Sequence, residues 1–160
     1  MTNLRSYTLA LLSWILLLGL HILPSCAWAM SKDEEIRLGK EFVLKAKEHF
    51  EFLEEPYPLM FLKELVDLLY EQEANKPFDI SIYLLKKGDL NAFAAPGGNL
   101  FLFTGLIERI EDLDRLSGVV AHELAHVSFR HISNKLSQSY KSGLATLGGM
   151  LLGALVGGAP

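Results

Sequence analysis

Apolar side chains recur at helical spacing over residues 36–53. Ser31 precedes this segment and Glu34 follows three residues later, which is a common pattern at the start of an α-helix. The prolines within residues 54–58 cannot continue a helix. We therefore expect a first helix that starts at Ser31 and ends before Glu54. Its apolar positions are Ile36, Phe42, Val43, Ala46, Phe50 and Leu53.

Residues 59–73 show a second amphipathic pattern, which predicts a helix that packs on the core. Its expected buried side is Phe61, Leu62, Leu65, Leu68 and Leu69. From Phe78 the pattern becomes alternating, and Ile80, Ile82 and Leu84 predict a strand. Two further strands are expected at residues 91–95 and 99–103. Residues 96–98 (Pro-Gly-Gly) join them and allow a tight turn.

A third helix is expected to begin at Asp112 and to reach at least Arg130. The last segment, residues 143–160, contains no charged side chain. It is short and glycine-rich for a bilayer span, so a buried or membrane-touching hairpin is favoured over a span. Membrane contact through residues 143–160 is therefore part of the prediction.

The first 29 residues resemble a secretory signal peptide. Arg5 is followed by an apolar run at residues 9–20, and residues 27–29 (Ala-Trp-Ala) form a small-x-small cleavage site. Cleavage before Met30 is expected, leaving residues 30–160 as an exported domain. The alternative is a lipoprotein anchored through Cys26, because residues 23–26 (Leu-Pro-Ser-Cys) resemble a lipobox.

Composition narrows the class of protein. Half of the 160 residues are apolar, 21% are charged, and the formal net charge is -4. This balance is typical of one globular domain, and the scattered basic residues argue against nucleic acid as a partner. Cys26 is the only cysteine, so a metal site in the mature domain would have to use histidines and carboxylates.

His122, Glu123 and His126 form an H-E-x-x-H motif within the third helix. Residues four apart lie on one helix face, so the two imidazoles can hold one metal ion. Glu123 lies beside them, where its carboxylate can accept a proton from a metal-bound water. Zn²⁺ is the expected ion, one per domain. Ala121, Leu124, Ala125 and Val127 make the helix apolar nearly all round, which predicts that the motif is buried.

A catalytic zinc site needs a third protein ligand, and no Asp or Glu follows His126 in this sequence. His131 lies about 140° around a continuous helix from His126, so it is expected to be a second-shell or packing group unless the helix breaks. The metzincin spacing would need a histidine six residues after His126, but that position is Ile132. We therefore expect a glutamate from beyond Pro160, and a chain truncated before it.

Residues 121–131 (A-H-E-L-A-H-V-S-F-R-H) resemble the metal helix of the HtpX and CAAX-prenyl-protease family of zinc metallopeptidases. Residues 91–94 (N-A-F-A), 96–98 (P-G-G) and 104–106 (T-G-L) resemble the strand pair before that helix in the exported, β-barrel-assembly-enhancing branch. The resemblance covers roughly residues 36–155.

The resemblance implies an α+β, zincin-like domain, incomplete at its C-terminus. It also implies that His122 and His126 are zinc ligands, that Glu123 is the base, and that a glutamate on a later helix is the third ligand. Residues 91–95, beginning with Asn91, would form an edge strand beside the cleft, although Asn91 could equally only close a hairpin.

The implied function is a periplasmic zinc metalloendopeptidase whose substrates are unfolded or misassembled exported proteins, including clients of outer-membrane protein assembly. The alternative is a non-catalytic binding module of the same fold that lacks the third zinc ligand. A membrane-embedded protease is a third possibility, which the signal-like N-terminus disfavours.

Overall fold

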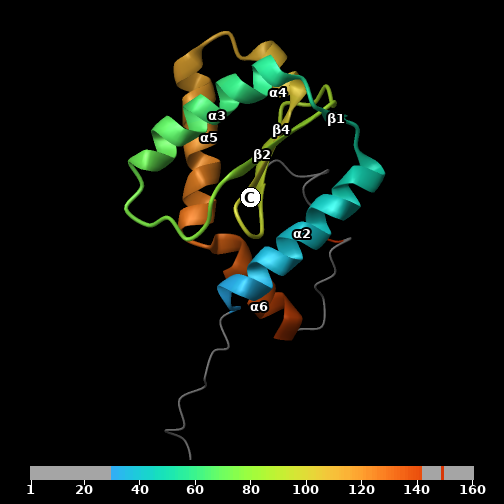
Figure 1. Cartoon of the computed structure of the whole chain (residues 1–160), viewed down its shortest axis with the longest axis vertical. Coiled ribbons are helices and arrows are strands. Elements are labelled where there is room, and N and C mark those ends of the chain that lie inside the picture. Colours follow the sequence, from blue (N-terminus) through green and yellow to red (C-terminus); the bar gives the residue numbers. More distant parts are fainter. Residues whose placement is uncertain (1–29, 142–148, 150–160) are drawn as a thin grey trace, which may run out of the picture.

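The computed structural model describes residues 30–141 and Gly149, which form helices packed on both faces of a four-stranded sheet (Figure 1). The expected signal peptide with Cys26 lies outside the described residues, as does the tail at 143–160 apart from Gly149. Within the described part of the chain, no helix combines the length and apolarity needed to cross a bilayer. The α+β class is confirmed.

Helix α2 (Lys32–His49) begins where the sequence predicts. The Ser31 Oγ accepts the Glu34 N–H at 3.2 Å, and the Ser31 N–H donates to Glu34 Oε2 at 2.9 Å, which completes a capping box. The helix ends earlier than expected, because Phe50 is extended and strand β1 (Phe52–Leu53) follows. Residues 52–53 pair with the sheet instead of adding a helical turn.

Helix α3 (Pro56–Glu71) starts earlier than the predicted residue 59. Proline suits the first helical turn because the N–H that it lacks would have no acceptor there. Leu62 and Val66 are fully buried, whereas Phe61 and Leu68 are 47% and 63% exposed, so their expected burial is wrong. The buried face of α3 contacts both α5 and strand β2. Compared with the predicted face, it includes Val66 and Tyr70 in place of Phe61 and Leu68.

The sheet contains β1, β2 (Ser81–Leu85), β3 (Ala92–Ala95) and β4 (Asn99–Phe103) in the order β1-β2-β4-β3. The three expected strands are confirmed, and β1 is additional. Strands β3 and β4 form the predicted antiparallel hairpin, whereas β2 and β4 are parallel, with Ser81 opposite Asn99. Strand β3 is therefore at an edge of the sheet.

The hairpin turn requires glycine. Gly97 and Gly98 have φ angles of 74° and 81°, in the region that L-residues seldom adopt. A Cβ on Gly98 would also lie 2.4 Å from the Asp79 carbonyl oxygen. The Pro-Gly-Gly segment thus fixes the turn that aligns β3 with β4.

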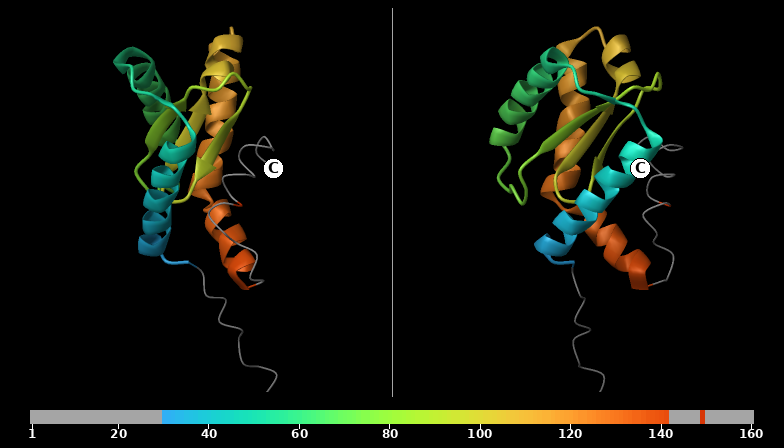
Figure 2. Two further views of the ribbon diagram at one scale, coloured as in Figure 1. Left: turned by 90° about the vertical axis from the view of Figure 1, so that its right-hand side faces the viewer. Right: turned by 45° about the vertical axis from the view of Figure 1, so that its right-hand side comes forward.

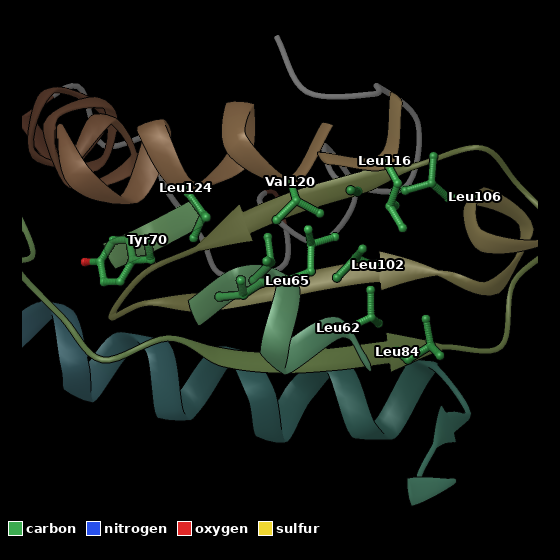
Figure 3. Close-up of a cluster of buried hydrophobic side chains, with 12 residues drawn as sticks. Leu62, Leu65, Tyr70, Leu84, Leu102, Leu106, Leu116, Val120 and Leu124 are labelled. Carbon is green, nitrogen blue, oxygen red and sulfur yellow. The ribbon is translucent and has the colours of Figure 1, made fainter. Parts of the chain in front are cut away.

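Alternate side chains of the strands enter two separate cores. Leu100 and Leu102 of β4 join the cluster under α3 and α5, and Phe101 and Phe103 join the cluster under α2. Figure 2 shows α2 crossing the sheet on the side opposite α5, and Figure 3 shows Leu116, Val120 and Leu124 of the first cluster between α5 and the strands. The second cluster is Phe42, Ala46, Leu85, Phe93, Ala95, Phe101 and Phe103.

Within residues 104–141 the sheet is followed by α4 (Thr104–Arg109), α5 (Leu113–Ser128) and α6 (His131–Lys141). Asp112 caps α5, as predicted, by accepting the Asp114 N–H at 2.9 Å. The prediction that this helix reaches Arg130 is wrong. It ends at Ser128, and Arg130 has a φ of 51°, the one positive φ at a non-glycine residue in the described part of the chain.

Candidate metal centre

Helix α5 presents its H-E-x-x-H motif at the border between core and solvent. Glu123, Leu124 and Val127 are buried, whereas Ala121 and His122 are exposed and His126 is half-buried. The expected burial is therefore confirmed for Glu123 and wrong for His122. The apolar residues of the helix cover one face only, because α5 packs against α3 and β3 on that side. The open side leaves the histidines accessible.

The two imidazoles of the motif converge. The Nε2 atoms of His122 and His126 lie 3.2 Å apart, with ring centroids separated by 4.8 Å. Nitrogens bound to one tetrahedral zinc lie about 3.3 Å apart, so this pair fits the ion. Burial lowers the pKa of His126, and His122, His131 and Lys135 lower it further. A neutral ring is the form that binds a metal.

Glu123 is held by the edge strand. Its side chain is buried, and its Oε2 accepts the Ala94 main-chain N–H at 3.0 Å. Burial raises the pKa of Glu123 above its usual 4.5, while the hydrogen bond from Ala94 and the nearby His122 oppose that rise. Strand β3 thus fixes the carboxylate beside the histidines.

His131 lies next to His126, which the expected continuous helix did not allow. The Nδ1 atoms of His126 and His131 are 3.0 Å apart, because the chain breaks after Ser128 and α6 starts at His131. His126 therefore faces His122 with Nε2 and His131 with Nδ1. Predicting this contact from the sequence would have required a residue that breaks the helix. Residues 127–131 contain neither glycine nor proline, so the sequence gives no such indication.

The main chain of Asn91 belongs to the sheet and not to the histidine group. Its carbonyl accepts the Phe103 N–H at 3.0 Å, so it extends the β3–β4 ladder. No set of three or more His, Cys, Asp or Glu side chains arranged to hold a metal occurs within the described residues. The described part of the chain therefore offers two converging imidazoles and one adjacent carboxylate.

A groove of about 650 Å³ lies on the other side of the sheet, between α2, the 76–79 segment and β2. Its lining includes Lys40, Lys47 and Tyr83, and none of the motif residues. The chemical groups of the site are thus separate from this groove.

Comparison with protein families gives a match to peptidase family M48 over residues 61–159. This range covers more than half of the chain and includes the whole H-E-x-x-H motif. The chain belongs to peptidase family M48. The resemblance inferred from the motif is thereby confirmed, and M48 is a family of zinc metallopeptidases.

Curated relatives within M48 include two proteins named "Beta-barrel assembly-enhancing protease". The one from Yersinia pestis is 25% identical over 127 residues, and the one from Escherichia coli K12 is 24% identical over 127 residues. Each alignment covers 79% of this chain and 26% of the relative. The bovine "Metalloendopeptidase OMA1, mitochondrial" is 39% identical over 56 residues, which is 35% of this chain and 11% of that protein. The chain thus spans about a quarter of the length of the first two relatives.

Proposed function

We propose that this chain carries part of the zincin-like catalytic domain of a zinc metalloendopeptidase. The observation that carries the proposal is the 3.2 Å approach of the His122 and His126 Nε2 atoms beside the carboxylate of Glu123. His122 and His126 would hold the ion. Zinc would supply a Lewis acid and would lower the pKa of a bound water to about 7.

Glu123 is the proposed general base. The Ala94 N–H fixes its carboxylate on the edge of the sheet, and burial favours its neutral form, so that taking up a proton there costs less than it would in water. His131 would orient His126 through Nδ1, and Asn91 would lie at the start of the strand beside the substrate. In this proposal His122 and His126 bind the metal, His131 orients His126, and Glu123 accepts a proton.

A third ligand completes the proposal. Catalytic zinc sites have three protein ligands, and the described residues supply two imidazoles. The M48 relatives extend far beyond the aligned region. We propose a glutamate from a segment that this sequence does not contain. Without it the chain would be the alternative, a binding module of the same fold.

The proposed substrates are unfolded or misassembled exported proteins, with clients of outer-membrane protein assembly among them. Support comes from the name of the two bacterial relatives, "Beta-barrel assembly-enhancing protease", and from the signal-like residues 1–29. The proposed location is the periplasm, with a mature chain that starts at Met30. The intact mass of the exported protein tests this, because a diacylglycerol adduct on Cys26 would instead show a lipoprotein.

Zinc binding by residues 30–160 tests the ligand assignment. Isothermal titration should show weak binding of one Zn²⁺, which His122→Ala and His126→Ala abolish, because each removes one of two imidazoles. His49→Ala, at the C-terminal end of α2, is the matched control and should bind like the parent chain. Equal binding by all four proteins would contradict the assignment.

Peptidase activity tests Glu123. In a longer form that supplies the third ligand, we expect tight zinc binding and cleavage of casein. Glu123→Gln should abolish turnover and keep the metal, because it removes the base and no ligand. If Glu123→Gln cleaves at the parent rate, Glu123 is not the base; if the parent binds zinc without cleaving, the binding-module function is favoured.

A further inference from the structure

Arg130 makes contacts that tie the end of the metal helix to the start of α2. Its Nε donates to Glu35 Oε2 at 2.9 Å, and one terminal nitrogen lies 2.8 Å from the same oxygen. That terminal group also donates to the Met30 carbonyl at 2.7 Å. The guanidinium lies 5.8 Å from the ring centroid of Phe78.

This pair differs from a surface ion pair. The Glu35 side chain is 4% exposed and that of Arg130 is 26% exposed, whereas the Arg37–Glu41 pair on α2 is 64% and 43% exposed. A buried carboxylate needs a charged or hydrogen-bonding partner, so Glu35 fixes where the guanidinium lies. Arg130 is also the residue that carries the unusual φ of 51°. The ion pair therefore fixes the side chain of the residue that lies between α5 and α6, where the chain leaves one helix and enters the next.

A hydrogen bond also fixes the chain on the other side of the break, at the end of α5. The Asn75 side-chain amide donates to the carbonyl of Ser128, the last residue of α5. A carbonyl in the last turn of a helix has no partner within the helix. Asn75 thus stabilises the end of α5, and Glu35 fixes Arg130 two residues later.

The break has a consequence for the histidines. In a continuous helix His131 would lie about 140° around the axis from His126. Because α6 begins anew at His131, the two Nδ1 atoms lie 3.0 Å apart. A ligating histidine commonly bonds through its other ring nitrogen to a partner that fixes its tautomer and orientation.

We propose that Arg130, fixed by Glu35, is a positioning residue that acts through His131 on His126. It holds the break that places His131 Nδ1 against His126 Nδ1, so that His126 carries its proton on Nδ1 and presents a bare Nε2 toward His122. The inference rests on the proposed function, since it concerns the histidines that would bind zinc. Helix α2 precedes the residues matched by the M48 family model, so the pair joins a flanking helix to the family region.

Imidazole tautomers provide the test that is independent of metal. Long-range ¹H–¹⁵N spectra of the metal-free, full 160-residue chain should show the His126 proton on Nδ1 and the His131 proton on Nε2. Glu35→Gln should convert the His126 signal to a mixture of both tautomers. Glu41→Gln, which breaks the exposed pair on the same helix, is the control and should leave the signal unchanged.

Zinc affinity provides the second readout. We expect Glu35→Gln and His131→Ala each to weaken binding by about 10- to 100-fold, the usual effect of losing an outer partner of a ligand. If Arg130 acts through His131, Glu35→Gln should cause no further loss in the His131→Ala background. Additive losses, or parent-like tautomers in a folded Glu35→Gln protein, would overturn the proposal.

Two further results, a misfolded Glu35→Gln protein and a parent chain that binds no zinc, can each be interpreted. If Glu35→Gln fails to fold, Arg130→Lys replaces it, because lysine keeps the charge but cannot reach Glu35 and Met30 with one rigid fork. Lysine should give an intermediate His126 signal, and a parent-like signal would overturn the proposal. If the parent chain shows the expected tautomers but binds no zinc, the proposed function fails while the positioning role stands.

Discussion

The hydroxyl groups of Ser128 and Ser133 are buried and have no hydrogen-bond partner within the described residues. An unsatisfied buried polar group costs free energy, because it has lost its bonds to water. Ser128 is also the last residue of α5, directly before the break that places His131. Its main-chain carbonyl, and not its side chain, receives the bond from Asn75.

We predict that Ser128→Ala leaves the fold intact and raises the free energy of unfolding by about 1 kcal/mol, because it removes the unsatisfied hydroxyl. Urea unfolding measures this. Ser31→Ala is the control, since Ser31 Oγ caps α2, and it should lower stability by about 1 kcal/mol. A loss at Ser128 as large as that at Ser31 would show that the Ser128 hydroxyl has a partner after all.

The motif residues were predictable from the sequence, whereas their environment was not. Spacing of four residues is enough to place His122 and His126 on one face of a helix. The bond from Ala94 to Glu123 joins residues 29 apart in the sequence, and nothing in the local pattern of either segment indicates it. The same holds for the contact between His126 and His131, which depends on a tertiary bond to Arg130.

Helices α2 and α5 each contain a glycine at an interior position, for different reasons. A Cβ on Gly39 would lie 2.2 Å from the Pro96 carbonyl oxygen, so α2 crosses the hairpin turn too closely for any side chain. A Cβ on Gly118 would meet no atom within 4 Å among the described residues. Gly39 therefore sets the distance between α2 and the hairpin turn, whereas Gly118 packs against none of the residues that the structure describes.

We predict that Gly118→Ala raises the free energy of unfolding by about 1 kcal/mol, because alanine favours a helix over glycine by that amount. Gly39→Ala has the same helical gain and should nevertheless destabilise the protein, since α2 must move away from Pro96. Thermal unfolding of the two variants side by side checks both signs. A stabilised Gly39→Ala protein would contradict the close approach.

The ends of the helices could be predicted from the sequence only where local residues determine them. The start of α2 follows from Ser31 and Glu34, which lie within one turn of each other, and the prediction there is confirmed. The end of α5 was predicted too late, because residues 127–131 contain no helix-breaking residue. That break is held by Glu35 and Asn75, which come from distant segments.

At the level of the whole molecule, the sheet is covered by helices on both faces and its strand order is mixed. The sequence predicts three strands, one that begins near Phe78 and two at residues 91–95 and 99–103. It does not show that β2 and β4 are parallel neighbours, with β3 at the edge. Strand order depends on which helix covers which face, and that is decided by the packing of all layers together.

We predict that zinc stabilises the whole domain. A ligand that binds only the folded state at about 100 times its Kd raises the free energy of unfolding by about 2.7 kcal/mol, which corresponds to a rise in Tm of roughly 10 °C for a domain of this size. The parent chain and His49→Ala should show this rise, EDTA should reverse it, and His126→Ala should not show it. An equal rise in His126→Ala would place the bound zinc elsewhere.

The Glu35–Arg130 bond joins residues 95 apart, whereas the β3–β4 hairpin closes over three residues. Hairpins form within microseconds, but contacts between distant segments must first offset the entropy of a long loop. We therefore expect the Glu35–Arg130 contact, and with it the break that aligns His131 with His126, to form after the hairpin. His126 would then gain its Nδ1 partner only after α2 has packed against the end of α5.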